Sequence, residues 1–186
     1  MKKGLCFILA AALIGMLCAP ALAGSAGAPA QYLFGYIDDV NDTGFELVTN
    51  DQDTYQFMTQ PDTQISPSRD LAVGDAVRVA YLGGLEMNSV QQAVQVPRVT
   101  VLQCVNAVIT AVAADAVTVQ LEGDGRSYTF SLNSADVADG EDGIVVNSQA
   151  EICYDGALQD GLPAGQAQQL NYVHITVFGV SDSTSE

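Results

Sequence analysis

The chain has 186 residues and carries 22 acidic side chains against six basic ones, which gives it a formal net charge of −16. A surface of this sign repels phosphate backbones and anionic lipid headgroups, whose binding depends on basic side chains and the release of counterions. We therefore expect neither nucleic acid nor a membrane surface as a partner.

Residues 1–23 have the features of a secretory signal peptide. Lys2 and Lys3 give a basic start, residues 5–18 form an apolar run shorter than a bilayer span, and an Ala-x-Ala site ends at Ala23. We expect cleavage between Ala23 and Gly24, no membrane attachment afterwards, and a secreted or periplasmic protein.

Removal of the signal peptide makes the chain more acidic. Lys2 and Lys3 are its only lysines, so the mature chain keeps four arginines against 22 carboxylates, a formal charge of −18. Such a charge favours solubility outside the cell, and it can also attract a cation or a basic partner.

The first half of the mature chain is typical of short strands separated by turns. Residues 24–30 are small and without periodicity, and we expect a flexible lead-in there. Five strands are predicted at residues 32–40, 45–49, 55–57, 74–83 and 93–101. Residues 62–71 form a longer, irregular connection.

The same order returns in the second half. Strands are predicted at residues 105–112, 116–121, 128–130, 150–156 and 171–177, with one possible helical turn at 134–139. Tyr-x-Phe and the strand from Gly74 to Gly83 recur after 73 residues, and Gln92–Val96 recurs as Gln166–Leu170 after 74. This nearly constant offset indicates an internal duplication.

Five short strands in about 70 residues favour a small closed barrel. The predicted fold is all-β, with two tandem five-stranded Greek-key (OB-like) barrels related by internal duplication. The first spans residues 31–99 and the second 100–180, followed by a disordered tail at 181–186. The connection is too short for a flexible linker, so we expect the barrels to touch.

The cysteine content predicts one disulfide. Cys6 and Cys18 leave with the signal peptide, and lipid attachment at Cys18 is not expected because Leu17, not a small residue, precedes it. Alternation predicts a core face on each of two strands, made by Val105, Ala107, Ile109 and Ala111 and by Ala150, Ile152 and Tyr154. Cys104 and Cys153 then lie on the outer faces of these strands, which are neighbours in such a barrel. We expect them to be bonded; a free or redox-active thiol is the alternative.

The sequence offers no clear catalytic or metal constellation, so we expect a protein that is not an enzyme and has no cofactor. The single histidine, His174, lies on an alternating strand and is expected to be packed or exposed and not a general base. The loop from Asp38 to Gly44 partly matches calcium-loop spacing, but the flanking strands favour a hairpin turn. Residues 136–143 form a second acidic cluster without a recognised calcium spacing.

Four tyrosines fall in matched pairs on the predicted strands, Tyr55 with Tyr128 and Tyr81 with Tyr154. We expect them to pack in the cores, with aromatic contacts to a sugar or peptide as the alternative.

The repeated hairpin, Tyr-x-Phe, Gly-Asp strand and final Gln-Ala strand resemble tandem small five-stranded (OB-like) barrel domains of exported bacterial proteins whose function is uncharacterised. The Gly-Asp marker is replaced by Asn147-Ser148 in the second unit. The resemblance implies a secreted, non-enzymatic binding or interaction module for an unknown protein, peptide or cation ligand. The alternative is a structural component of an extracellular or envelope assembly.

Overall fold

A computed structural model describes residues 29–87, 90–138 and 143–180. The predicted signal peptide and its cleavage site, most of the lead-in, part of the second acidic cluster and the tail lie outside the described residues. Within the described part of the chain, no helix has the length and hydropathy needed to span a bilayer.

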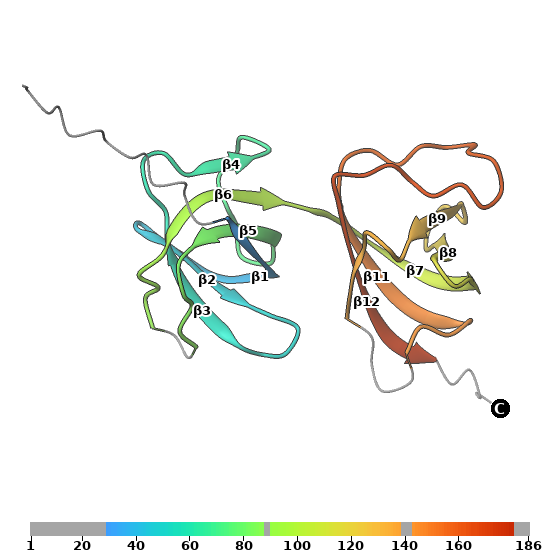
Figure 1. The fold of residues 1–186 in the computed structure, drawn as a ribbon, viewed down its shortest axis with the longest axis horizontal. Coiled ribbons are helices and arrows are strands. Elements are labelled where there is room, and N and C mark those ends of the chain that lie inside the picture. Colours follow the sequence, from blue (N-terminus) through green and yellow to red (C-terminus); the bar gives the residue numbers. More distant parts are fainter. Residues whose placement is uncertain (1–28, 88–89, 139–142, 181–186) are drawn as a thin grey trace, which may run out of the picture.

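The described residues form two curled sheets that lie side by side (Figure 1). The strands of the first are β1 (Gln31–Asn41), β2 (Gly44–Val48), β3 (Thr54–Met58), β4 (Gln64–Ser66), β5 (Ala76–Leu82) and β6 (Gln95–Val101). The strands of the second are β7 (Gln103–Val112), β8 (Ala116–Leu121), β9 (Ser127–Ser131), β10 (Asp136–Ala138), β11 (Ser148–Asp155) and β12 (Tyr172–Val180).

The two sheets have the same strand order, β3-β2-β1-β5-β6-β4 in the first and β9-β8-β7-β11-β12-β10 in the second. In each, the first strand lies between its hairpin partner and a strand from later in the chain, as a Greek key requires. The prediction of an all-β protein with two tandem OB-like domains is confirmed.

Each sheet contains a sixth strand that the sequence did not predict. Ile65 of β4 pairs with Val99 of β6, and Val137 of β10 pairs with Ile175 of β12, both in parallel. The predicted helical turn at 134–139 is therefore wrong, because residues 136–138 complete the free edge of β12. A three-residue strand has a single inward side chain, so it leaves no periodic signal in the sequence.

The cores follow the predicted alternation. Ala150, Ile152 and Tyr154 of β11 are buried in the second core, as predicted, and Ala107 and Ile109 of β7 pack beside them. Ala111 was expected on the same face but is exposed, because the pairing of β7 with β8 shifts between Ile109 and Ala111. Such a bulge turns the following side chains to the other face of the strand.

A buried glutamine holds the long loop before the last strand of each domain. The Gln92 Oε1 accepts from the Glu86 N–H at 2.6 Å, and the Gln168 Oε1 accepts from the Gln159 N–H at 2.7 Å. Each residue also donates from its backbone to the third strand of its own sheet, to Gln56 and Thr129. Gln92 of the first domain thus corresponds to Gln168 of the second, and not to Gln166. After this loop, equivalent residues of the two domains are therefore 76 residues apart in the sequence, and not 74 as predicted.

Candidate binding groove between the domains

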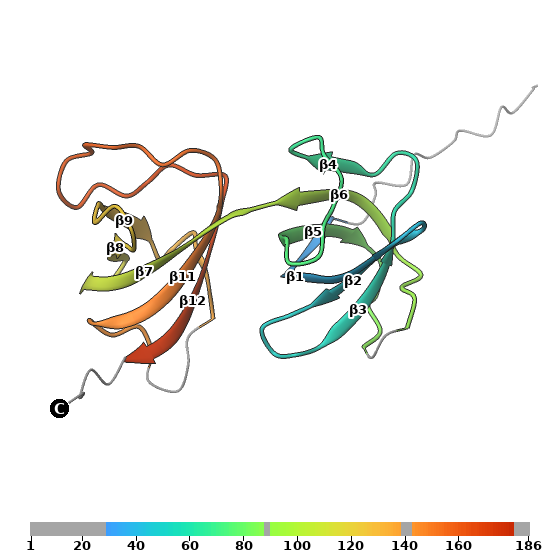
Figure 2. The ribbon, with the colours of Figure 1, turned by 180° about the vertical axis from the view of Figure 1, so that it is seen from behind.

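One residue connects the two domains. The strand β6 ends at Val101 and β7 begins at Gln103, so only Leu102 lies between them, which Figures 1 and 2 show as a continuous crossing from one sheet to the other. The Leu102 N–H donates to the carbonyl of Ala76 at 2.8 Å, and its side chain is buried. The domain boundary therefore lies at Leu102, slightly after the predicted division between residues 99 and 100.

A small apolar cluster joins the domains at this point. Phe34 and Ala76 from the first domain are buried against Leu102 and against Cys153 of β11. Cys153 points away from the core of its own barrel, as predicted, but it is only 1% exposed because the first domain covers that face. Around Cys153, the outer face of the second barrel is thus an interface and not a solvent-exposed surface.

Cys104 and Cys153 lie opposite each other on β7 and β11 and are joined by a disulfide across 49 residues. The matching pair in the first domain is Tyr32 and Ala80, which face each other on β1 and β5. The first domain therefore has no equivalent bridge. Side-chain parity, together with the expected pairing of the two strands, predicted the bridge between Cys104 and Cys153.

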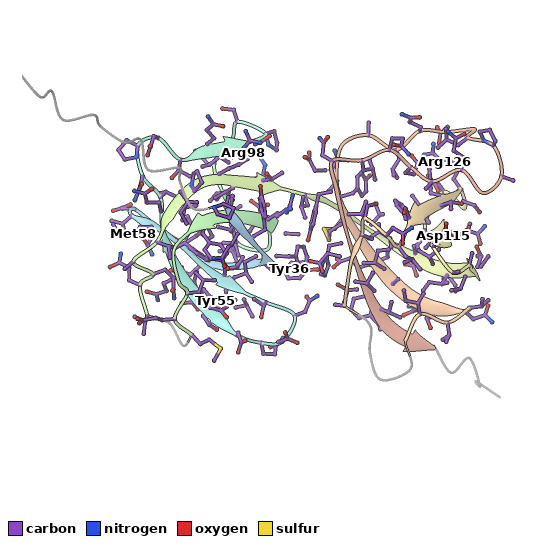
Figure 3. All side chains as sticks on the ribbon, in the orientation of Figure 1. Tyr36, Tyr55, Met58, Arg98, Asp115 and Arg126 are labelled. Carbon is purple, nitrogen blue, oxygen red and sulfur yellow. A yellow bond between two sulfur atoms is a disulfide. The ribbon has the colours of Figure 1, made fainter. Side chains whose placement is uncertain are left out.

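Tyr36 makes the main polar contact across the junction. It lies between the two domains (Figure 3), and its hydroxyl donates to the Glu151 Oε2 on β11. Burial raises the pKa of Tyr36, and the hydrogen bond to Glu151 raises it further. The phenol therefore stays protonated and keeps its role as donor throughout the neutral pH range.

His174 is the second junction residue and is only 4% exposed. Its ring stacks on Phe34 with the centroids 3.7 Å apart, and its Nε2 lies 2.9 Å from the Nδ2 of Asn50 in the first domain. The Nδ1 lies 3.3 Å from the Asp136 Oδ2, outside hydrogen-bonding geometry. His174 is therefore packed, as predicted, and its unprotonated Nε2 accepts from Asn50.

The state of His174 gives the junction a pH dependence. Burial lowers the pKa of His174, against the opposing effects of Asp136 and Glu151. A histidine with a lowered folded-state pKa stabilises the fold fully above the unfolded-state value of about 6.5 and loses this contribution as the pH falls below it. Urea unfolding at pH 7.5 and 5.0 should show a larger loss of stability in the natural protein than in His174→Gln. Equal losses in the two proteins would contradict the role of His174.

Three hollows lie along the junction and together form what we call the interdomain groove. Their volumes are about 440, 390 and 670 Å³, and Tyr32 lines all three. The first and the second share Phe34 and Asp136, and the second and the third share Arg78 and Asn171. Tyr32 is 54% exposed, so its ring is available to a ligand at the centre of the groove.

The two ends of the groove differ in charge. The first hollow is lined by Asp51, Asp53 and Asp136 together with His174. The third is lined by Arg78 and Arg98, two of the four arginines of the chain, and by Asp62 and Asp155. Arg98 projects from β6 near β4 (Figure 3). The groove therefore combines an aromatic centre, an acidic end and an end where two cations and two carboxylates lie together.

The loop from Asp38 to Gly44 contains a hairpin turn, as predicted. The Asn41 Oδ1 accepts hydrogen bonds from both the N–H and the hydroxyl of Thr43, at 3.0 and 2.8 Å, so it is used within the turn. Among the described residues, the one group of three potential metal ligands is Cys104, Glu151 and Cys153, and its two sulfurs are bonded to each other.

The four matched tyrosines pack in the cores, as predicted. The Tyr81 hydroxyl donates to Gln31 and the Tyr154 hydroxyl to Gln103, which are corresponding bonds in the two domains. Sequence reasoning chose these tyrosines and missed those that line the junction.

The missed residues lie on β1, where both faces are apolar. Leu33 and Ile37 point into the first core, while Tyr32, Phe34 and Tyr36 alternate on the opposite face. A strand with only one covered face should alternate with polar residues, so this doubly apolar pattern was a signal that another domain covers β1.

No protein-family model matches the chain, and no curated protein matches it. Among solved structures, domains CSD456 of Drosophila Unr align over 84% of this chain and 64% of their own, with 11% identity and a TM-score of 0.30. A multidomain protein with nucleic acid binding domains from Streptococcus pneumoniae TIGR4 aligns over 82% of this chain and 46% of its own, with 17% identity and a TM-score of 0.22. The chain spans less than two thirds of either protein.

These matches overturn one expectation. Nucleic acid was excluded as a partner on net charge, whereas the second matching protein is described by its nucleic acid binding domains. The exclusion relied on net charge, which describes the whole chain, whereas Arg78 and Arg98 lie together in one hollow of the groove. The exclusion is withdrawn.

Proposed function

We propose that this chain is an exported, non-enzymatic binding module that holds a peptide segment of a partner in the interdomain groove. The observation that carries the proposal is the continuity of the three hollows around Tyr32, from the acidic end to the end with Arg78 and Arg98. Neither domain contains this groove alone, so binding in it requires both domains. We infer that the two domains arose by duplication.

The chemistry of the groove favours a peptide. Exposed aromatic rings bind side chains and peptide planes, and Tyr supplies a large contact area at a low entropic cost. Carboxylates at one end, and guanidinium groups beside carboxylates at the other, suit a chain that carries both signs of charge. The buried His174 supports a non-enzymatic role, because its Nε2 already accepts from Asn50 and its ring is stacked on Phe34.

The test is selection of a random-sequence peptide library on the mature chain, followed by calorimetric titration of the selected peptides. Tyr32→Ala should weaken binding about tenfold or more, since a central exposed tyrosine is a typical hot-spot residue. Phe178→Ala is the matched control, because Phe178 is 62% exposed and lies outside the groove.

Peptides that bind both variants equally, or a selection without binders, would refute the proposal. Concentration-dependent self-association in light scattering, without peptide binding, would favour the assembly role instead.

A further inference from the structure

Arg78 differs from Arg69 and Arg126 in having no acidic partner among the described residues. Arg69 forms an ion pair with Asp75 at 2.7 Å, and Arg126 forms ion pairs with Asp124 and Asp160 at 2.6 and 2.7 Å. Within residues 29–87, 90–138 and 143–180, no carboxylate forms an ion pair with Arg78, and its buried Nε has no hydrogen-bond partner.

Two aromatic rings hold the guanidinium of Arg78 in place. Its Cζ lies 3.8 Å from the centroid of the Tyr32 ring and 4.3 Å from that of Tyr172, which belongs to the second domain. Stacking occupies the faces of the guanidinium and leaves its N–H donors directed outward in its plane. The Nε is buried, but Arg78 lines the second and third hollows, so a ligand there can supply an acceptor to the donors of its Nη groups.

Arg98 lies on the same face of the first sheet. Arg78 pairs with Thr100 and Ala80 pairs with Arg98, so the two arginines are diagonal neighbours on β5 and β6. The Arg98 Nη2 donates to the Gln64 Oε1 at 3.1 Å and forms no ion pair with a described carboxylate. Both side chains line the hollow of about 670 Å³.

We infer that Arg78 and Arg98 form a carboxylate-binding site at one end of the interdomain groove. This inference rests on the proposed function and specifies the chemical group that is recognised there. The planar fork of an arginine matches a carboxylate in two parallel hydrogen bonds. Asp62 and Asp155 line the same hollow, so its four charges balance and a ligand with one negative charge fits better than a dianion. The carboxyl terminus of a peptide, with its N–H groups facing the two aspartates, has this chemistry.

The test uses the side-chain Nε–H signals of the four arginines in a ¹⁵N NMR spectrum of the mature protein. Hippurate is the probe and hippuramide, which lacks the charge, is its neutral match. Hippurate should shift the Arg78 and Arg98 signals in a saturable way, while Arg69 and Arg126 serve as internal controls because they are already paired. Arg98→Gln should weaken hippurate binding about tenfold, the loss expected for one charge-assisted hydrogen bond.

Equal shifts with hippurate and hippuramide, equal shifts of all four arginines, or no saturable shift of Arg78 would overturn the inference. Tighter binding of inorganic phosphate or of a short oligothymidylate at Arg78 and Arg98 would overturn the assignment to a carboxylate.

A comparison of one library-selected peptide with a free and with an amidated carboxyl terminus separates this inference from the proposed function. Equal, Tyr32-dependent binding of both forms would refute the carboxylate site and leave the groove as the binding site. If no peptide binds the groove, the proposed function fails, and the hippurate titration still decides the arginine site.

Discussion

Replacing Cys104 and Cys153 together by alanine should lower the free energy of unfolding of the second domain by about 4 kcal/mol, the chain-entropy value for a loop of this length. The bridge joins residues 49 apart and so removes much of the freedom of the unfolded chain. Alanine is preferred to serine because Cys153 is 1% exposed, and a serine hydroxyl there would be buried without a hydrogen-bond partner. Urea unfolding followed by hydrogen exchange of each domain measures the effect.

Two comparisons make the cysteine result specific. Asn106→Ser, on the exposed face of the same strand, should change stability by no more than about 0.5 kcal/mol. Reduced natural protein should unfold at nearly the same urea concentration as the double-alanine variant. Two alkylatable thiols in the mature protein before reduction, or no loss of stability in the variant, would show that the bridge does not stabilise the second domain.

Phe34→Ala should weaken the coupling between the two domains by about 3 kcal/mol, the lower end of the range for removing a buried phenylalanine. Phe34 lies on the outer face of β1, is 7% exposed, and contacts His174 at 3.7 Å and Tyr36 at 5.4 Å between ring centroids. The core of the first domain is on the other face of this strand. We therefore expect both domains to stay folded while the contact between them is lost.

Thermal unfolding and small-angle scattering measure this coupling. The variant should unfold in two separated transitions and have a larger radius of gyration, while the natural protein unfolds as one unit. Phe178→Ala is the control, because it removes the same ring from a position that is 62% exposed and should leave both measurements unchanged. A Phe34 variant that keeps a single transition and the natural dimensions would show that other contacts hold the junction.

Much of the fold could be predicted because its information is local. Alternation in β5 and β11 fixed which residues point inward, and the same parity placed Cys104 opposite Cys153. The short edge strands β4 and β10 could not be predicted, since three residues show no period and their pairing depends on a free edge elsewhere in the sheet.

The candidate site was harder to predict, because it is made by contacts between domains. Arg78 was visible in the sequence, but its isolation from carboxylates depends on the packing of Tyr32 and Tyr172 from two domains. His174 likewise contacts Asn50, which lies 124 residues earlier in the sequence. Parity can assign such residues to an outer face, but it cannot show what covers that face.

The single-residue connection at Leu102 bears on how quickly a ligand can enter and leave. In the natural protein the buried Leu102, its bond to Ala76 and the packing of Phe34 hold the domains together, so the proposed groove should not need to open around a hinge. Association should therefore proceed in one kinetic phase, at a rate set by diffusion and electrostatic attraction. The lifetime of the complex should depend on the contacts made in the groove and not on a slow opening step.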